Sequence, residues 1–193
     1  VFHKIAEDGE VLFKGRNVMK EYYKMPKETE ETFTDDGWLR SGDLGMIDEN
    51  DVLKITGRKK DLIITAGGKN IAPSRIEGIM ITSKYINQFC VIGDQRKYLS
   101  AIASLDEENI KAFAAENQIV FSDYSELLKH PDIQALIEKE VAIRNKELPS
   151  FETIKKVKIV PEFTIENNTM TPTFKLKKNI ILKTYENDIQ SMY

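Results

Sequence analysis

Two short segments decide how this chain folds and what it binds: Trp38–Asp43, with the sequence WLRSGD, and Gly57–Asp61, with the sequence GRKKD. Glycines and strand-forming residues around them place the segments at the ends of successive short strands. Asp43 has two acceptor oxygens that can take both hydroxyls of a ribose, and Arg58 offers a rigid fork of donors to hydroxyls or phosphate oxygens. The pair predicts a nucleotide site. The alternative is a turn aspartate and a surface arginine in an ordinary hairpin.

Composition narrows the classes of protein that need to be considered. The chain has 193 residues, enough for one ordinary domain or a small part of a larger protein. Its net charge is −3 with acidic and basic residues interspersed, so no basic surface for nucleic acid is expected. No apolar run of membrane-spanning length and no signal sequence is found. His3 and His130 are far apart, so no metal site is expected, and Cys90 is expected to be a buried, unreactive thiol.

The pattern of predicted elements changes near Gly57–Asp61. Before it we expect short strands and little helix: strands over 11–14, around Trp38, around Met46 and over 52–56, a helical turn over 18–23 and a helix over 27–33. After it strands and helices alternate: a hairpin around 66–68, strands over 89–92, 99–105 and 155–160, and helices over 73–82, 107–117, from 131 and over 176–189. This alternation predicts an α+β domain.

Two local signals support helices in the second part. Asp106 is a credible N-cap for the helix that ends near Asn117. In the helix that Pro131 opens, apolar residues recur at i, i+3, i+4 and i+8, at positions Ile133, Leu136, Ile137 and Val141. This spacing predicts an amphipathic helix packed on a sheet.

Longer stretches carry a family resemblance. Residues 9–77, 87–109 and 171–178 resemble the ordered motifs of adenylate-forming enzymes (acyl-CoA synthetases, adenylation domains and luciferases), in particular long-chain fatty acid:CoA ligases. The resemblance implies that residues 1–57 are the C-terminal part of a large N-terminal domain, ending in a small β-rich subdomain. Residues 58–193 would be the compact, mobile C-terminal α+β domain, with a small sheet flanked by helices. Because the chain opens at Val1 and lacks the family's phosphate loop, we expect a fragment with little activity alone.

The resemblance also implies a reaction and its cofactors. A fatty acid carboxylate attacks the α-phosphate of ATP to give acyl-AMP and pyrophosphate, and the thiol of CoA then displaces AMP. Mg²⁺ would be held mainly by the nucleotide and by the N-terminal part outside this chain. Asp43 would bind the ribose hydroxyls, Arg58 the ribose and phosphate, and Ile55 would lie against the nucleobase. The alternative for Ile55 is an ordinary strand residue in the core.

The catalytic lysine of the family matches Lys175. The run Thr171-x-Thr173-x-Lys175-Leu176-x-Lys178 is similar to the family pattern Thr-x-Ser/Thr-Gly-Lys-Ile-x-Arg, with Phe174 in place of the usual glycine. A positive charge between the carboxylate and the α-phosphate would lower the barrier to bringing two anions together. The departure at Phe174 leaves open a second register with Lys177 as the catalytic residue. A plainer interpretation is that the lysines only solvate a terminal helix.

Two further roles follow from the resemblance. Lys60 would be the hinge about which the C-terminal domain rotates between the half-reactions. Gly67 and Gly68 are expected in a turn with positive φ, and their lack of a side chain would admit the pantetheine arm of CoA, with Lys69 near a CoA phosphate. The alternatives are a surface lysine at 60 and a purely structural turn.

Two rival functions remain open at this point. One is an adenylating enzyme that uses another acid or a carrier-protein acceptor. The other is a non-enzymatic nucleotide-binding interaction module. We expect a cytoplasmic protein, with peripheral attachment to a membrane as the alternative, and the acyl chain length would be set outside this chain.

Overall fold

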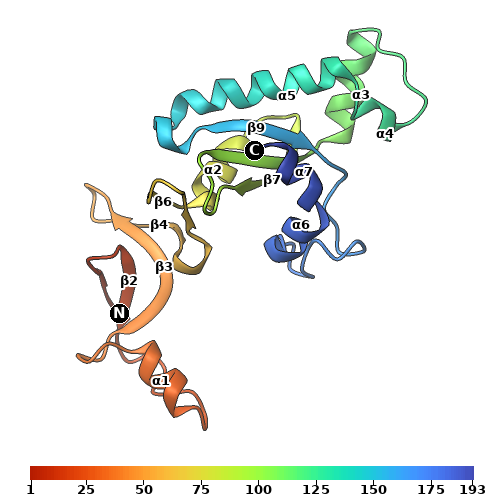
Figure 1. Ribbon diagram of the computed structural model, residues 1–193. Helices are drawn as coiled ribbons and strands as arrows, with labels where there is room; N and C mark the ends of the chain where they lie inside the picture. The colour runs from red at the N-terminus through yellow and green to blue at the C-terminus, as the bar shows by residue number, and fades with distance from the viewer. The chain divides into compact units, whose positions relative to one another are not determined.

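The computed structural model describes residues 1–193 and divides into two compact units, Val1–Leu62 and Ile63–Tyr193 (Figure 1). The division falls at the end of the Gly57–Asp61 segment, a few residues after the Gly57–Arg58 boundary expected from the sequence. The first unit extends beyond that boundary because it includes the end of strand β4 (Leu53–Arg58) and a 3₁₀ turn, η1 (Lys59–Asp61).

The first unit is a four-stranded antiparallel sheet with one short helix. The strands lie in the order of the chain: β1 (Phe2–Ile5), β2 (Glu10–Lys14), β3 (Leu39–Ile47) and β4. Helix α1 (Pro26–Thr32) lies between β2 and β3 in sequence, where a helix was expected. It has no buried residue.

Two expectations for this unit were wrong, and one strand was missed. Residues 18–23 form bends and irregular backbone rather than helix, in keeping with the cost of starting a helix in so short a segment. Strand β1 was not predicted. The two short strands expected around Trp38 and Met46 are one continuous strand, β3, because its glycines are not strand ends. A Cβ at Gly45 would lie 2.9 Å from the carbonyl oxygen of Lys54, so glycine permits a close approach of backbones beside a register shift in β3.

The second unit is built on a three-stranded sheet with strand order β7-β8-β9. Strands β7 (Ile86–Ile92) and β8 (Leu99–Leu105) are antiparallel, whereas β9 (Ile154–Ile159) is parallel to β8. A parallel neighbour needs a long crossover, and the chain between β8 and β9 supplies it. That crossover contains α3 (Glu107–Glu116), α4 (Tyr124–Leu127), α5 (Pro131–Arg144), η2 (Asn145–Glu147) and η3 (Ser150–Glu152).

The remaining elements of the second unit precede or follow this sheet. The hairpin of β5 (Ile63–Ile64) and β6 (Asn70–Ile71) leads into α2 (Pro73–Met80). The chain ends with α6 (Lys178–Thr184) and α7 (Glu186–Ser191). One helix was expected over 176–189, but the helical run is interrupted at Tyr185, whose ring packs edge-to-face on the buried Phe163 with centroids 6.1 Å apart. Tertiary packing thus overrides the local pattern.

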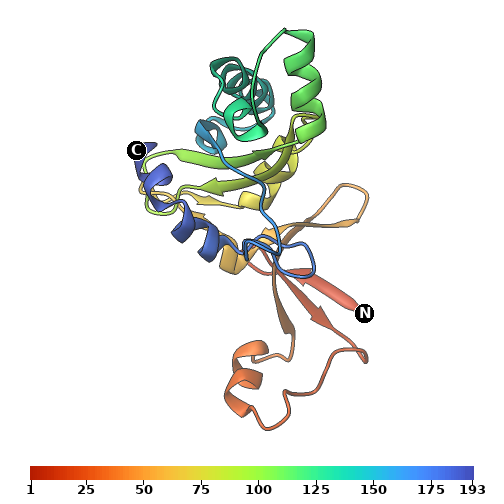
Figure 2. The same cartoon turned by 90° about the vertical axis from the view of Figure 1, so that its right-hand side faces the viewer.

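Apolar clusters cover both faces of the three-stranded sheet. Figure 2 shows the helices that lie over these faces, α5 on one side and α6 and α7 on the other. Helix α5 buries Ile133, Ile137 and Val141 in the larger cluster, which confirms the predicted amphipathic helix. Ile102 of β8 lies in the smaller cluster. The N-cap at Asp106 is confirmed as well, because its side chain accepts a hydrogen bond from the backbone N–H of Asn109.

Candidate functional site

Asp43 and Arg58 lie directly opposite each other on β3 and β4. The Nε of Arg58 donates to Oδ1 of Asp43 at 3.0 Å, and both side chains reach solvent, with 31% of Asp43 and 66% of Arg58 exposed. An exposed ion pair of this kind contributes only about 0–1 kcal/mol, so a ligand can compete for either partner. The structure therefore brings together the carboxylate and guanidinium that the sequence singled out.

A buried carboxylate fixes the backbone beside Asp43. Glu10 has only 3% of its side chain exposed; its Oε1 accepts from the N–H of Gly42 at 3.0 Å, and its Oε2 accepts from Lys59 at 3.0 Å. Lys59 also bonds Asp8 at 2.6 Å, which lowers the pKa of Asp8 and raises that of Lys59 from their ordinary values. Sequence reasoning missed Glu10, because only the fold brings it beneath the WLRSGD segment.

Ile55 lies on β4, paired with Gly45, and 55% of its surface is exposed. Within this chain Ile55 is therefore not a core residue. The contact with a nucleobase stays a prediction.

Lys60 lies in η1, exposed and without an ion-pair partner, whereas its neighbour Lys59 is held by two carboxylates. It comes two residues before the division between the compact units at Leu62–Ile63. A hinge here would leave the contacts of Lys59 within the first unit undisturbed. That role stays a prediction.

The two glycines of the β5–β6 hairpin differ in a way the sequence did not reveal. Gly68 has φ +73° and its N–H donates to the carbonyl oxygen of Thr65 at 2.8 Å, so the turn itself requires glycine there. The expectation of a positive φ at Gly67 was wrong. A Cβ at Gly67 would meet only Oγ1 of Thr65, at 3.9 Å, so packing within this chain does not demand glycine.

Lys69 follows these glycines and is paired with an aromatic ring. Its Nζ lies 5.7 Å from the ring centroid of Phe151. A cation held over an aromatic face remains exposed enough to meet an anion, but nothing else in the structure marks a phosphate position.

Lys175 lies in a short hairpin whose ends form a bridge between Met170 and Leu176. The N–H of Phe174 donates to the carbonyl oxygen of Thr171 at 2.9 Å, and the N–H of Thr171 donates to that of Lys175 at 2.8 Å. Oγ1 of Thr171 accepts from the N–H of Lys175 at 3.0 Å, which gives the first threonine of the motif a local role. Phe174 has φ +58°, the left-handed position of this loop type, where glycine is the residue that fits most easily.

The lysines around this hairpin are not equivalent. Nζ of Lys177 donates to Oδ1 of Asn168 at 2.5 Å, and Nζ of Lys178 donates to Oε1 of Glu77 at 2.9 Å. Lys175 is exposed and its ammonium has no partner in the protein. Lys175 precedes α6, whereas Lys177 is the N-cap residue of that helix and Lys178 is its first residue. Lys175 is the one of these lysines whose charge is free to meet a ligand.

Glu77 ties three elements of the second unit together. From α2, its Oε1 accepts both from Lys178 at the start of α6 and from the N–H of Val91 in β7, the latter at 3.0 Å. Since this carboxylate is largely buried, it orders the domain and positions the chain directly after the Lys175 hairpin.

Replacing Glu77 with Ala should destabilise the second unit by about 1–3 kcal/mol, because the N–H of Val91 and the charge of Lys178 lose their partner. Glu77→Gln should cost less, since the amide oxygen can still accept from Val91. Urea unfolding followed by circular dichroism measures both, with Glu116→Ala, at an exposed site on α3, as the matched control. If Glu77→Ala lowered the free energy of unfolding no more than the control does, Glu77 would have no role in ordering the second unit.

Cys90 lies in β7 with no exposed surface, and burial raises the pKa of its thiol to about 12. The prediction of a buried thiol is confirmed. A buried thiol with a raised pKa is a poor nucleophile at neutral pH.

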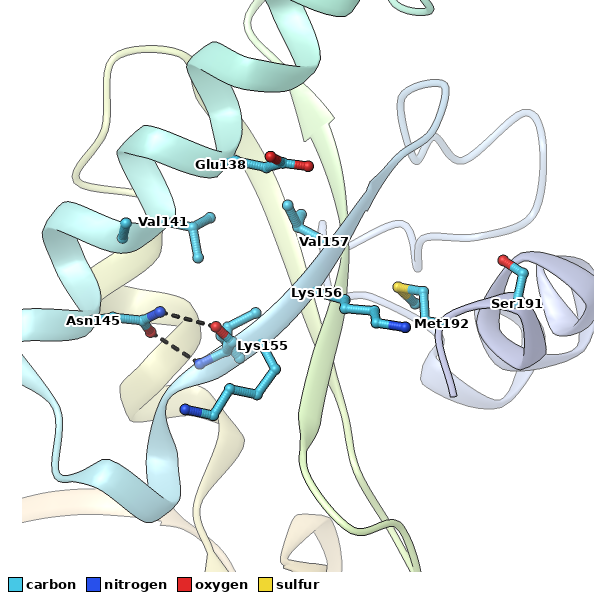
Figure 3. Close-up of a pocket in the computed structure, with 10 residues that line it drawn as sticks. Glu138, Val141, Asn145, Lys155, Lys156, Val157, Ser191 and Met192 are labelled. Carbon is cyan, nitrogen blue, oxygen red and sulfur yellow. Dashed lines mark hydrogen bonds between the residues drawn. The ribbon is translucent and has the colours of Figure 1, made fainter.

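A pocket of about 410 Å³ lies between α5, β9 and the C-terminal end of α7. Figure 3 shows the side chains that line it. The side chain of Asn145 donates to the carbonyl oxygen of Ile154 and accepts from its N–H, both at 2.9 Å, so this amide fastens the start of β9. None of the predicted site residues lines the pocket. No group of three or more His, Cys, Asp or Glu side chains is arranged to hold a metal ion. None of the helices has the length and apolar character needed to cross a bilayer.

Comparison with known proteins gives the family. A family model described as the AMP-binding enzyme C-terminal domain matches residues 60–193, which include Lys60, the Gly67–Gly68 turn and Lys175. The chain belongs to this family of adenylate-forming enzymes. The helices and small sheets of the structure confirm the α+β class expected from the sequence.

Two curated relatives and one solved structure place the chain within the family. It is 36% identical to a long-chain-fatty-acid–CoA ligase, FadD15, of Mycobacterium tuberculosis over 98% of this chain and 32% of the relative. It is 36% identical to long-chain-fatty-acid–CoA ligase 5 of Mus musculus over 100% of this chain and 29% of the relative. The adenylation domain of a carboxylate reductase from Mycobacterium chelonae superposes with a TM-score of 0.76 at 25% identity, over 96% of this chain and 27% of that one. The chain thus spans about a third of the length of these relatives.

Proposed function

We propose that this chain is the C-terminal portion of a long-chain fatty acid:CoA ligase that forms acyl-AMP and then acyl-CoA. The observation that carries the proposal is the 36% identity to long-chain-fatty-acid–CoA ligases over nearly the whole chain. Residues 1–57 would complete the large N-terminal domain, and residues 58–193 would be the mobile C-terminal domain. On this proposal the isolated chain has little activity, because most of the nucleotide site and the acyl site are in the remainder of the N-terminal domain.

The nucleotide would meet the sheet of the first unit. Asp43 keeps Oδ2 free of the Arg58 contact, so its carboxylate can accept from the ribose hydroxyls, with Arg58 turning toward ribose or phosphate. Glu10 supports this step because it holds the backbone at Gly42 in place. The exposed Ile55 offers an apolar surface to the nucleobase.

Lys175 would act in adenylate formation. In that step the carboxylate of the fatty acid attacks the α-phosphorus of ATP, a bond forms between carboxylate oxygen and phosphorus, and pyrophosphate leaves with its bonding electrons. The ammonium of Lys175 would lie between the two anions and lower their repulsion as they approach. Its lack of a protein partner supports this role over Lys177, which is bound to Asn168.

The second half-reaction would use other residues of the same domain. A rotation at Lys60 would replace the Lys175 hairpin with the Gly67–Gly68 turn at the reacting carbonyl. The pantetheine arm would pass beside Gly67, and its thiolate would displace AMP to give the thioester. The loose surroundings of Gly67, where a Cβ would meet only Oγ1 of Thr65 at 3.9 Å, support this path, and Lys69 would meet a phosphate of CoA.

Mg²⁺ would accompany ATP, where it supplies charge neutralisation for the leaving pyrophosphate. We assign it no ligand in this chain, since its acidic residues form no suitable group. We also propose that the parent enzyme is cytoplasmic, with peripheral membrane attachment as the alternative that fractionation would reveal.

The full-length parent tests the proposal. With ATP, Mg²⁺, CoA and palmitate it should give acyl-CoA, AMP and pyrophosphate in equal amounts, and hydroxylamine should trap the acyl-AMP when CoA is omitted. The isolated chain should fold but show no sub-micromolar ATP binding by calorimetry. Transfer of the acyl group to a carrier protein in preference to CoA would support the alternative acceptor. ATP binding without any adenylate would support the non-enzymatic nucleotide-binding module.

A further inference from the structure

Phe174 is unusual both in its backbone conformation and in the exposure of its ring. Its backbone has φ +58°, a conformation that favours glycine or asparagine, and 75% of its surface is exposed. A glycine here would remove the backbone strain. An asparagine tolerates this conformation and is also polar, as an exposed position favours. Neither the first nor the second cluster of buried apolar residues includes this ring. Within this chain, therefore, nothing accounts for a phenylalanine here.

A bulky residue in an unfavourable conformation at a loop tip points to a contact made elsewhere. The neighbouring residue is Lys175, the lysine with no protein partner. Thr171 accepts hydrogen bonds from the N–H groups of Phe174 and Lys175 and donates one to the carbonyl oxygen of Lys175. These bonds hold the backbone of Phe174 and Lys175 together. Whatever holds the ring in place consequently also limits where the ammonium can be.

We propose that Phe174 is a positioning residue that anchors the Lys175 hairpin for adenylate formation. Its ring would pack on an apolar surface of the large N-terminal domain outside this chain, beside the nucleotide. This inference rests on the proposed function, which requires Lys175 to enter a site formed largely by that domain. The relatives are long enough to contain such a domain, since about two thirds of each lies beyond the part that this chain matches.

A contact at Phe174 would restrict the positions that the flexible side chain of Lys175 can take. A lysine side chain is a long flexible stem with a compact charge, and a hairpin that docks by charge alone would leave it many positions. An apolar contact at the adjacent residue would limit those positions before the reaction begins. The anchor would act in adenylate formation alone, because the hairpin is withdrawn when the Gly67–Gly68 turn takes its place.

Variants of Phe174 in the full-length enzyme test the proposal. Phe174→Gly and Phe174→Asn both suit the backbone but remove the ring, and we expect each to lower kcat for acyl-AMP formation on the order of tenfold to a hundredfold. Conversion of supplied acyl-AMP to acyl-CoA should stay at the wild-type rate. Phe174→Leu, which keeps an apolar anchor, should restore most of the adenylation rate. Equal rates for wild type and Phe174→Gly, or equal defects in Phe174→Leu and Phe174→Asn, would overturn the proposal.

Stability measurements separate anchoring from folding. In the isolated chain, Phe174→Gly should melt at a higher temperature than Phe174→Ala, because both lack the ring and only alanine keeps a Cβ at positive φ. The reverse order would show that the hairpin does not adopt this conformation in solution, and the proposal would fall. Failure of the wild-type parent to form acyl-AMP would instead refute the proposed function itself.

Discussion

Replacing Lys175 with Ala in the full-length enzyme should slow acyl-AMP formation by a factor on the order of 10²–10³, about 3–4 kcal/mol of transition-state stabilisation. The reason is that its ammonium would act only while the fatty acid carboxylate approaches the α-phosphate. Thioester formation from supplied acyl-AMP should proceed at the wild-type rate. Pyrophosphate release and acyl-CoA formation, measured separately, give the two rates.

Lys177→Ala is the matched control for Lys175. It removes an identical charge two residues away, at a side chain already bound to Asn168, and should leave adenylation nearly unchanged. A larger adenylation defect in Lys177→Ala than in Lys175→Ala would transfer the catalytic role to Lys177. An equal loss of both half-reactions in Lys175→Ala would mean that the hairpin is needed for folding rather than for charge.

Gly67→Leu should produce the opposite pattern, with adenylation intact and thioester formation slowed on the order of 10². Within this chain a Cβ at position 67 would meet only Oγ1 of Thr65, at an ordinary contact distance of 3.9 Å, so the variant should fold normally. In the thioester-forming arrangement the same side chain would fill the path of the pantetheine arm. Rates from acyl-AMP and CoA, compared with rates of pyrophosphate release, measure the effect.

Gly68→Ala is the informative comparison for this turn. Because Gly68 has φ +73°, its substitution strains the backbone and should lower the melting temperature, whereas Gly67→Leu should not. Equal loss of both half-reactions in folded Gly67→Leu protein would leave the turn with a structural role alone.

The sequence predicted those parts of the fold in which one local rule decides the outcome. The spacing of Ile133, Ile137 and Val141 predicted the buried face of α5, and the side chain of Asp106 predicted the start of α3. Continuous β3 was not predictable, because a glycine such as Gly45 looks the same whether it ends a strand or admits a close neighbour. The break at Tyr185 depends on a ring contact with Phe163 that only the folded chain provides.

The same distinction between local signals and contacts made only in the fold applies to the candidate site. Asp43, Arg58 and Lys175 could be singled out because their chemistry is specific and their motifs are ordered along the chain. Glu10 could not, since its part in the site depends on burial beneath β3 and on the charge of Lys59. The difference between Gly67 and Gly68 depends on a backbone angle that the two letters do not encode.

The burial of Cys90 bears on the fate of an activated acyl group. An acyl-adenylate is an electrophile, and an accessible protein thiolate nearby would compete with CoA and leave the enzyme acylated on itself. The sole cysteine of this chain lies within β7 and its thiol, with a pKa of about 12, stays protonated at neutral pH. On the proposed function, this part of the enzyme therefore contributes no accessible thiol that could compete with CoA.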